Sequence, residues 1–250
     1  MPGDNPLGSS VPNWSPPDRP HPVPIQGRYC SLEPLEPGKH AALLFREFTG
    51  RDDLWSYLPY GPFHSAASYH RWMRETVSQK EDLFFAIRDS ERMITGGVAS
   101  YLRITPEAGT IEVGNICLAP SLQRTRAATE AMVLMMQWAF EAGYRRYEWK
   151  CDALNQPSRQ AAQRLGFSYE GVFRQARVVK GRNRDTAWFS VIDSEWNAMK
   201  EAYDAWLSPA NFKANGQQIE RLSDLTGLVR ANDDPTQSSY LDPVLDRGHI

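Results

Sequence analysis

The sequence predicts a mixed α/β fold built on one sheet with helices on both of its faces. Two observations predict this class. Expected strands and helices alternate along the chain in the order β-α-α-β-β-β-α-β-α-β-β. In addition, a long apolar helix over 127–142 joins two expected strands, and a helix in that position makes the two strands parallel neighbours in one sheet.

The first half of the chain begins with a strand over 28–35. Helices follow over 38–48, where Ala42, Leu43 and Phe45 are among the apolar positions, and over 65–77. Three strands come next, the first two separated by an Asp-Ser-Glu-Arg turn; they cover 83–88, 94–103 and 110–118.

The second half opens with the helix over 127–142, which Gly143 ends. A strand over 146–151 follows. The next helix, over 157–165, begins with a proline, a residue favoured in the first turn of a helix. Two last strands, over 172–180 and 186–192, form a hairpin around the Gly-Arg-Asn-Arg-Asp segment at 181–185.

These elements define a core over 28–206 between two polar ends. Residues 1–27 contain eight prolines before Ile25, which predicts an extended or disordered arm. Residues 207–250 form a polar tail in which one amphipathic patch, 219–228, predicts a short docked helix. A hydrophobic fraction of 41% and a charged fraction of 23% are typical of a globular protein.

Charge and cysteine usage exclude several classes of function. A net charge of −2 gives no whole-domain basic field for nucleic acid. The longest apolar run, 131–136, is too short to cross a membrane, and the first residues lack the pattern of a secretory signal. Three widely spaced cysteines (Cys30, Cys117 and Cys151) indicate free thiols in a reducing, cytoplasmic compartment, and no metal-ligand spacing is present.

The stretch 116–130 is the most informative part of the chain. A strand ends at Pro120, a short polar loop follows, and a helix begins near Ala127. This arrangement directs unpaired backbone N–H groups and the positive end of the helix at one point, which suits a pyrophosphate. The small residues Ala127 and Ala128 let a ligand approach the backbone, and Arg124 and Arg126 could bind phosphate oxygens.

This stretch resembles the acyl-CoA-binding motif of the GNAT superfamily of N-acetyltransferases, in which a Gln or Arg, two residues, a Gly and one residue precede a Gly or Ala. Gln123 matches the first position and Ala128 the last, while Arg126 stands where the motif has its central Gly. Residues 54–59, 154–158, 164–167, 170–171 and 181–185 are similar to the RimJ/RimL-type subgroup.

The resemblance covers about 28–196. It implies a twisted, mostly antiparallel sheet and acetyl-CoA as co-substrate. It also implies direct transfer of an acetyl group to a primary amine of a protein N-terminus or a small molecule. The residues expected to hold the coenzyme are Ile116, Leu118, Gln123, Arg124, Thr125, Arg126, Ala127, Ala128, Thr129 and Asn155.

The proton transfers need a general base and a general acid. Glu112, which on a regular strand shares a face with Gly114 and Ile116, is the candidate general base. Ser158, on the apolar face of its helix, is the candidate acid, with Tyr169 as a second candidate. With direct transfer, Cys117 and Cys151 are core thiols and not nucleophiles.

The acceptor pocket is expected between the first helices and the last hairpin. The aromatic residues expected to contact the acceptor are Trp55, Tyr57 and Tyr60. Four basic residues of the hairpin could attract an acidic acceptor, the CoA 3′-phosphate or RNA, or form a solvated face; they are Arg177, Lys180, Arg182 and Arg184.

Two other functions stay open beside the enzyme. The first is a catalytically silent acyl-CoA-binding or regulatory module on the same fold, which Arg126 in place of the motif glycine favours. The second is a nucleic-acid-binding module using 180–184, against which the near-zero net charge argues. The acceptor amine is not defined by the sequence, and both a monomer and a homodimer are compatible with it.

Overall fold

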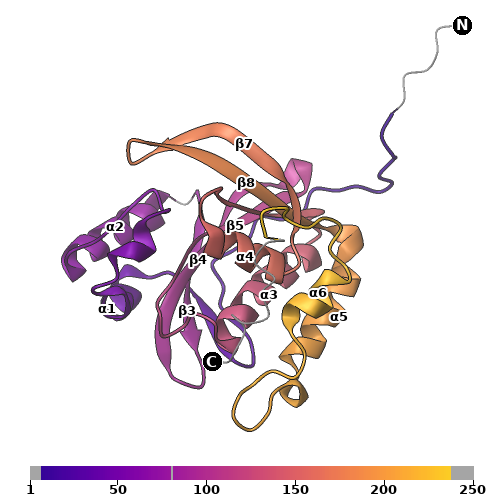
Figure 1. Cartoon of the computed structure of the whole chain (residues 1–250). Helices are drawn as coiled ribbons and strands as arrows, with labels where there is room; N and C mark the ends of the chain where they lie inside the picture. The colour runs from indigo at the N-terminus through magenta and orange to yellow at the C-terminus, as the bar shows by residue number, and fades with distance from the viewer. Residues whose placement is uncertain (1–6, 80, 238–250) are drawn as a thin grey trace, which may run out of the picture.

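The computed structural model describes residues 7–79 and 81–237, and its centre is a single twisted eight-stranded sheet (Figure 1). The strands lie in the order β1-β2-β3-β4-β5-β6-β8-β7. Every neighbouring pair is antiparallel except β5 and β6, which are parallel. The prediction of one mixed, mostly antiparallel sheet with helices on both faces is confirmed.

The strands are β1 (Ile25–Gln26), β2 (Cys30–Pro34), β3 (Leu83–Asp89), β4 (Ile94–Thr105), β5 (Thr110–Leu118), β6 (Arg146–Asp152), β7 (Ser168–Val179) and β8 (Arg182–Ile192). The helices are α1 (Pro37–Phe48), α2 (Ala66–Gln79), α3 (Arg126–Glu141), α4 (Gln156–Arg164), α5 (Asp193–Leu207) and α6 (Leu222–Gly227). Short 3₁₀ turns add η1 (Asp52–Trp55), η2 (Pro106–Ala108) and η3 (Pro209–Asn211).

Two hydrophobic cores hold the helices to the sheet. On one face α1, α2 and η1 cover β2 to β4 through a core that contains Leu44, Trp55 and Met73. On the other face α3, α4 and α5 cover the sheet through a larger core that contains Tyr147 and Phe189. Figure 1 shows α1 and α2 apart from the other helices, on the far side of the sheet. Among the described residues, none of the helices has the length and apolar character needed to cross a membrane.

The long helix α3 connects the parallel strands β5 and β6, as its apolar pattern predicts. Its N-terminal half is tied to the start of β2 by the buried carboxylate of Glu130. That carboxylate accepts hydrogen bonds from the backbone N–H groups of Arg28 (2.9 Å), Tyr29 (2.6 Å) and Cys30 (2.8 Å). A Cβ at Gly27 would lie 2.4 Å from Glu130 Oε2, so only glycine leaves room for this contact.

The elements differ from the expected ones in two places. The last hairpin does not turn around 181–185: the turn is at Lys180 and Gly181, and the following residues already belong to β8. The chain also forms a further helix, α5, directly after β8. In the arm, the extended residues Ile25 and Gln26 pair with β2.

Two β-bulges, one in β4 and one in β5, change which side chains share a face. In β5 an extra residue, Asn115 (φ 52°), lies between the pairs Ser100–Gly114 and Val98–Cys117. The strand alternation therefore reverses after Gly114, so Ile116 packs on the α3 face and does not share a face with Glu112. The expectation for Ile116 was wrong because it assumed a regular strand.

The strands β5 and β6 separate in the middle of the sheet. Their last ladder pair is Val113 with Trp149, although β5 continues to Leu118 and β6 to Asp152. Residues beyond this point face a gap between the two strands. The fold thus opens its sheet at the place where the loop before α3 begins.

Parts of both terminal segments pack on the domain. In the arm, Arg19 donates a hydrogen bond to the Ile104 carbonyl (2.9 Å), and Tyr144 donates to the Asp18 carbonyl (3.1 Å). In the tail, α6 buries Leu222 and Thr226. Beyond α6, Asp234 is buried against α4.

Candidate active site

The loop before α3 forms a defined helix start. Thr125 is the N-cap of α3: its hydroxyl oxygen accepts a hydrogen bond from the Ala128 N–H (3.1 Å) and its own hydroxyl donates to the Leu122 carbonyl (2.7 Å). The side chains of Ala127 and Ala128 are small and buried, so neither of them obstructs the start of the helix. The geometry suits an anion at this helix end.

The residues around this cap have separate roles. Gln123 is exposed and donates from its side chain to the Leu118 carbonyl (2.8 Å), while Arg124 is exposed in a left-handed conformation (φ 59°). Thr129 is buried and accepts a hydrogen bond from Arg164 of α4 (3.0 Å). This last contact joins α3 to α4.

Arg126 turns away from the loop. Its guanidinium pairs with Glu91 of the β3–β4 turn (3.0 Å) and lies over the rings of Tyr29 (4.6 Å) and Phe212 (4.9 Å). The side chain that replaces the motif glycine is thus held outside the helix start by its own partners. The expectation that Arg126 binds phosphate has no support in this geometry.

The first turn of α4 places Asn155 and Ser158 on the same side of the sheet as α3. Asn155 is the N-cap, and its side-chain oxygen accepts from the Ser158 N–H (3.2 Å). The Ser158 hydroxyl oxygen accepts a hydrogen bond from the Trp149 indole (3.0 Å). Because this oxygen is already an acceptor, its own proton is available to donate. Tyr169, the other candidate acid, packs edge-on against Phe189 (5.5 Å).

The three cysteines are free and buried, and burial raises the pKa of each thiol. The pKa of Cys151 rises to about 11 through burial, although a contact with the Ser158 hydroxyl opposes the shift. The pKa of Cys117 rises to about 12 for the same reason. Such thiols stay protonated at neutral pH, which is unfavourable for a nucleophile.

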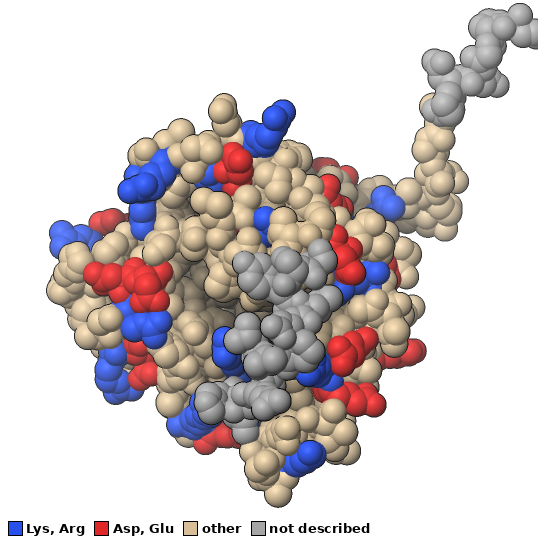
Figure 2. All heavy atoms as spheres, in the orientation of Figure 1, with Lys and Arg blue, Asp and Glu red and all other residues tan. Residues whose placement is uncertain are grey.

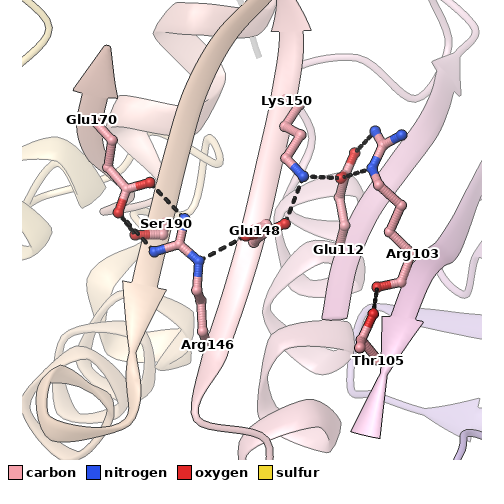
Figure 3. A network of polar contacts seen from close by, with 8 residues as sticks. All are labelled: Arg103, Thr105, Glu112, Arg146, Glu148, Lys150, Glu170 and Ser190. Carbon is pink, nitrogen blue, oxygen red and sulfur yellow. Dashed lines mark hydrogen bonds and ion pairs between the residues drawn. The ribbon is translucent and has the colours of Figure 1, made fainter. Parts of the chain in front are cut away.

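On the opposite face, Glu112 is the centre of a chain of ion pairs (Figure 3). It is 1% exposed, and its carboxylate contacts the Arg103 guanidinium (2.5 and 2.7 Å) and the Lys150 ammonium (3.0 Å). Lys150 also binds Glu148 (2.7 Å), from which the chain continues through Arg146 to Glu170. The predicted base therefore lies in a buried network whose two nearest neighbours are cations.

The bulge in β4 explains why Arg103 reaches Glu112. Arg103 has a φ of 46° and lies between the pairs Leu102–Glu112 and Thr105–Thr110, where β4 has one residue more than β5. In a regular strand Arg103 would point to the face opposite Leu102 and hence away from Glu112. The bulge redirects it.

An aromatic wall faces this network from α2 and the loop after α1. Tyr60 packs on Trp72 (4.3 Å between ring centroids), and its hydroxyl donates to Asn115 Oδ1 (3.4 Å). Tyr57 is 38% exposed and donates to the Leu154 carbonyl just before α4 (3.2 Å). The Trp55 ring, by contrast, is 4% exposed in the α1–α2 core, so its ring packs in that core and does not line the open space.

The β7–β8 hairpin lies over the space between the aromatic residues and the ion-pair network. Lys180, in the turn, donates from its ammonium to the Trp55 carbonyl (2.7 Å). Tyr57 thus links the loop after α1 to the segment before α4, and Lys180 links the hairpin to the same loop. Figure 1 shows the hairpin extending over the sheet towards α1 and α2.

Sequence reasoning missed several polar residues on this face. Arg103 and Lys150 had no motif to mark them. Asp82, just before β3, accepts a hydrogen bond from the Asn115 amide (3.1 Å). Burial raises the pKa of the Asp82 carboxyl above its ordinary value, although the bond from Asn115 opposes the shift. These residues meet only through strand register, which no local pattern reveals.

Within the described part of the chain, no group of three or more His, Cys, Asp or Glu side chains could hold a metal ion. The candidate site brings together three features: a capped helix start, a hydroxyl that can donate a proton, and a buried carboxylate network. Ser158 lies on one face of the sheet and Glu112 on the other, and the gap between β5 and β6 separates them.

Comparisons with known proteins agree with this arrangement. Residues 31–168 match the family model described as acetyltransferase (GNAT) domain. A GCN5-related N-acetyltransferase from Brucella melitensis is similar with 44% identity and a TM-score of 0.84, covering 87% of this chain and 100% of that chain. A probable acetyltransferase (GNAT family) from Chromobacterium violaceum ATCC 12472 has 41% identity and a TM-score of 0.73, covering 79% and 100%.

A more distant structure shares the fold. The microcin C7 self immunity acetyltransferase MccE, in complex with acetyl-CoA and AMP, has 20% identity and a TM-score of 0.59, covering 66% of this chain and 93% of that chain. None of the curated proteins matches this chain. The family model covers more than half of the chain, and the Brucella structure most of it, so the chain belongs to the GNAT family of acetyltransferases.

Proposed function

We propose that this protein is an N-acetyltransferase that moves the acetyl group of acetyl-CoA to a primary amine by direct attack in a ternary complex. One observation carries the proposal. The sheet opens between β5 and β6, with a proton-donating hydroxyl, Ser158, on one face and a carboxylate network around Glu112 on the other. Such a gap lets two substrates meet from opposite sides.

The coenzyme supplies the activated acetyl group. The residues that support binding of its pyrophosphate are the N–H groups at the start of α3, organised by Thr125, with Gln123 and Arg124 exposed beside them. Asn155 and Ser158 extend this surface along α4. Arg126 is not part of the proposed contact, because Glu91 and two aromatic rings hold it elsewhere.

The transfer forms one bond and breaks one. The amine nitrogen attacks the thioester carbonyl, so the C–N bond forms and the C–S bond breaks. Backbone N–H groups near the Asn115 bulge are placed to polarise that carbonyl. The departing sulfur takes its proton from the Ser158 hydroxyl, and the proton of the amine passes to a carboxylate. The carboxylate then releases this proton to solvent and Ser158 regains one from solvent, so both groups return to their starting state.

Two carboxylates compete for the role of base. Glu112 lies at the centre of the network, but both of its oxygens are engaged by cations. Asp82 is less buried, lies beside the bulge, and has a pKa that burial raises above its ordinary value, which favours uptake of a proton. We assign the role to Glu112 first and test Asp82 beside it.

The test measures release of free thiol from acetyl-CoA with a panel of primary amines. Thiol release that depends on the amine supports the proposal. Glu112→Gln should lower kcat/KM by at least about 100-fold while the Kd for acetyl-CoA, measured by calorimetry, stays the same. Should Asp82→Asn produce this loss and Glu112→Gln not, Asp82 is the base.

A matched cysteine variant tests the direct route. Cys151→Ala keeps the site otherwise intact and should leave turnover within about twofold of the unchanged protein. Loss of turnover in a folded Cys151→Ala protein would contradict direct transfer.

The alternative is a silent acyl-CoA-binding module on the same fold. The cations that engage Glu112, and Arg126 in place of a motif glycine, are the observations that favour it. Binding of acetyl-CoA without thiol release from any amine would establish this alternative. Within the family we place the chain in the RimJ/RimL-type subgroup, on the segments 154–158 and 164–167, and in a reducing cytoplasm, on its three free thiols.

A further inference from the structure

A strip of polar side chains on β8 lacks partners. Arg184, Thr186 and Trp188 alternate along the strand, so they share one face of the sheet. Among the side chains that the structure describes, the buried Arg184 Nε, Thr186 Oγ1 and Trp188 Nε1 have no hydrogen-bond partner. Buried polar atoms are nearly always paired, so three neighbours without partners on one strand are unusual.

This strip faces the acceptor side of the sheet. The Lys150 ammonium, which binds Glu112, lies 3.6 Å from the centroid of the Trp188 ring. Ser190, the next residue of the same row, donates to Glu170 at the end of the ion-pair network. The polar strip is therefore a continuation of the surface on which Glu112 lies.

Arg184 is the charged member of the strip. Within the described chain its guanidinium makes no hydrogen bond or ion pair, although the side chain is only partly exposed. Burial lowers its pKa, with Asp152 opposing the shift and the positive charges of Arg177 and Arg103 adding to it. A half-buried guanidinium without an anion is unfavourable unless a ligand supplies one.

The surroundings add positive charge and space. The surface is hollowed beside the hairpin, over about 710 Å³, next to Phe173, Arg174, Gln175 and Ala176. The Phe173 ring packs against the Trp188 ring (4.5 Å between centroids) and is 57% exposed, so the strip lies directly beside an open surface. Figure 2 shows basic side chains over the region where Figure 1 places the hairpin.

We propose that the acceptor amine carries a negatively charged oxygen group, and that Arg184 binds this group with Thr186 and Trp188. Both the Arg184 and the Trp188 nitrogens can only donate, so the group they bind must accept. The ion-pair network from Arg103 to Glu170 is internally balanced, so its carboxylates are already paired and none of them forms an ion pair with Arg184. This inference rests on the proposed acetyl transfer and names its substrate class.

The test compares pairs of acceptors in which one member carries an anionic group that the other lacks. The pairs are β-alanine with β-alaninamide, O-phosphoethanolamine with ethanolamine, and the amidated tripeptides Ser-Glu-Ala and Ser-Gln-Ala. Thiol release from acetyl-CoA gives kcat/KM for each. At least one charged member should exceed its neutral partner by about tenfold or more, and the best pair distinguishes carboxylate from phosphate.

Variants locate the effect. Arg184→Gln should raise KM for the preferred charged acceptor by about 10- to 100-fold and leave the neutral partner within about twofold. Arg184→Lys keeps the positive charge but not the planar set of N–H donors, so its KM should lie between those of the unchanged protein and Arg184→Gln. The control is Arg182→Gln, which removes the same charge from an exposed position two residues nearer the turn and should change KM by less than about twofold.

Several outcomes would overturn the inference. These are a panel in which no charged member exceeds its partner, equal effects of Arg184→Gln and Arg182→Gln, or a weaker Kd for acetyl-CoA in Arg184→Gln by calorimetry. The last result would place the anion on the coenzyme. If only the neutral amines are acetylated, this inference is wrong but the proposed function stands. If no amine is acetylated, the proposed function itself is wrong.

Discussion

The helix α4 and the polar strip of β8 differ in how their polar side chains are satisfied. Around α4 each functional group has a protein partner: Trp149 binds Ser158, and Asp234 binds Arg159 through two hydrogen bonds of 2.7 Å. On β8, the buried atoms Arg184 Nε, Thr186 Oγ1 and Trp188 Nε1 have no hydrogen-bond partner among the described residues. Polar groups that hydrogen-bond to one another within the fold contribute to its stability, whereas polar groups without such a partner are available to bind a ligand.

The largest loss of stability is expected where a buried ion pair is broken. Arg159 is 3% exposed and Asp234 is 1% exposed, so Arg159→Ala leaves a buried carboxylate without its cation. We expect a loss of about 3–5 kcal/mol in the free energy of unfolding, measured by urea denaturation. Arg184→Ala, measured beside it, should change stability by less than about 0.5 kcal/mol. Similar losses in both variants would remove the distinction between the two regions.

A smaller effect is expected at the start of α3. Thr125→Ala removes the side-chain acceptor for the Ala128 N–H and should cost about 1 kcal/mol of stability in the same assay. The Kd for acetyl-CoA should also weaken, because the helix start then has more freedom. Thr125→Ser keeps the hydroxyl and should retain both properties; if it behaves as the alanine variant does, the cap is not what organises the loop.

The smallest effect concerns a pair at the edge of the acceptor side. The Arg146 guanidinium beside Glu170 lowers the pKa of that carboxyl. The folded state therefore binds the proton less tightly than the unfolded state, so this contribution is present above the ordinary pKa of 4.5 and is lost as pH falls through the lowered value. Because the pair is partly exposed, Glu170→Gln should cost at most about 1 kcal/mol at pH 7.

The measurement for Glu170→Gln is urea denaturation over a range of pH. The difference from the unchanged protein should shrink towards zero at acidic pH, where Glu170 is protonated in both states. A difference that is independent of pH would mean that the glutamine acts through packing instead of charge.

The repeating patterns of the sequence predict most of the fold. Apolar spacing marks α3, and its position between two strands predicts the parallel pair β5 and β6. The helix α5 had a usable signal as well, since its buried residues Trp196, Met199, Tyr203 and Trp206 recur at helical spacing. That helix could have been predicted from the printed sequence.

The site is predictable only in part. The motif around Gln123 and the segment after Leu154 predict the proposed coenzyme side, because both are local in sequence. The acceptor side depends on two bulges, at Arg103 and Asn115, where residues other than glycine take left-handed conformations. No local sequence pattern predicts a left-handed residue within a strand. Which side chains share a face of β4 and β5, and therefore which residues contact Glu112, can be seen only in the three-dimensional structure.

The gap between β5 and β6 has a consequence for how specificity can diverge. In the proposed complex, α3 and α4 contact the donor of the acetyl group, and β8 contacts the acceptor on the opposite side of a single layer of strands. Substitutions at Arg184 or Thr186 can therefore select a new nucleophile without disturbing the machinery that recognises the thioester. Descendants of one ancestral gene can in this way share a donor and differ in what they modify.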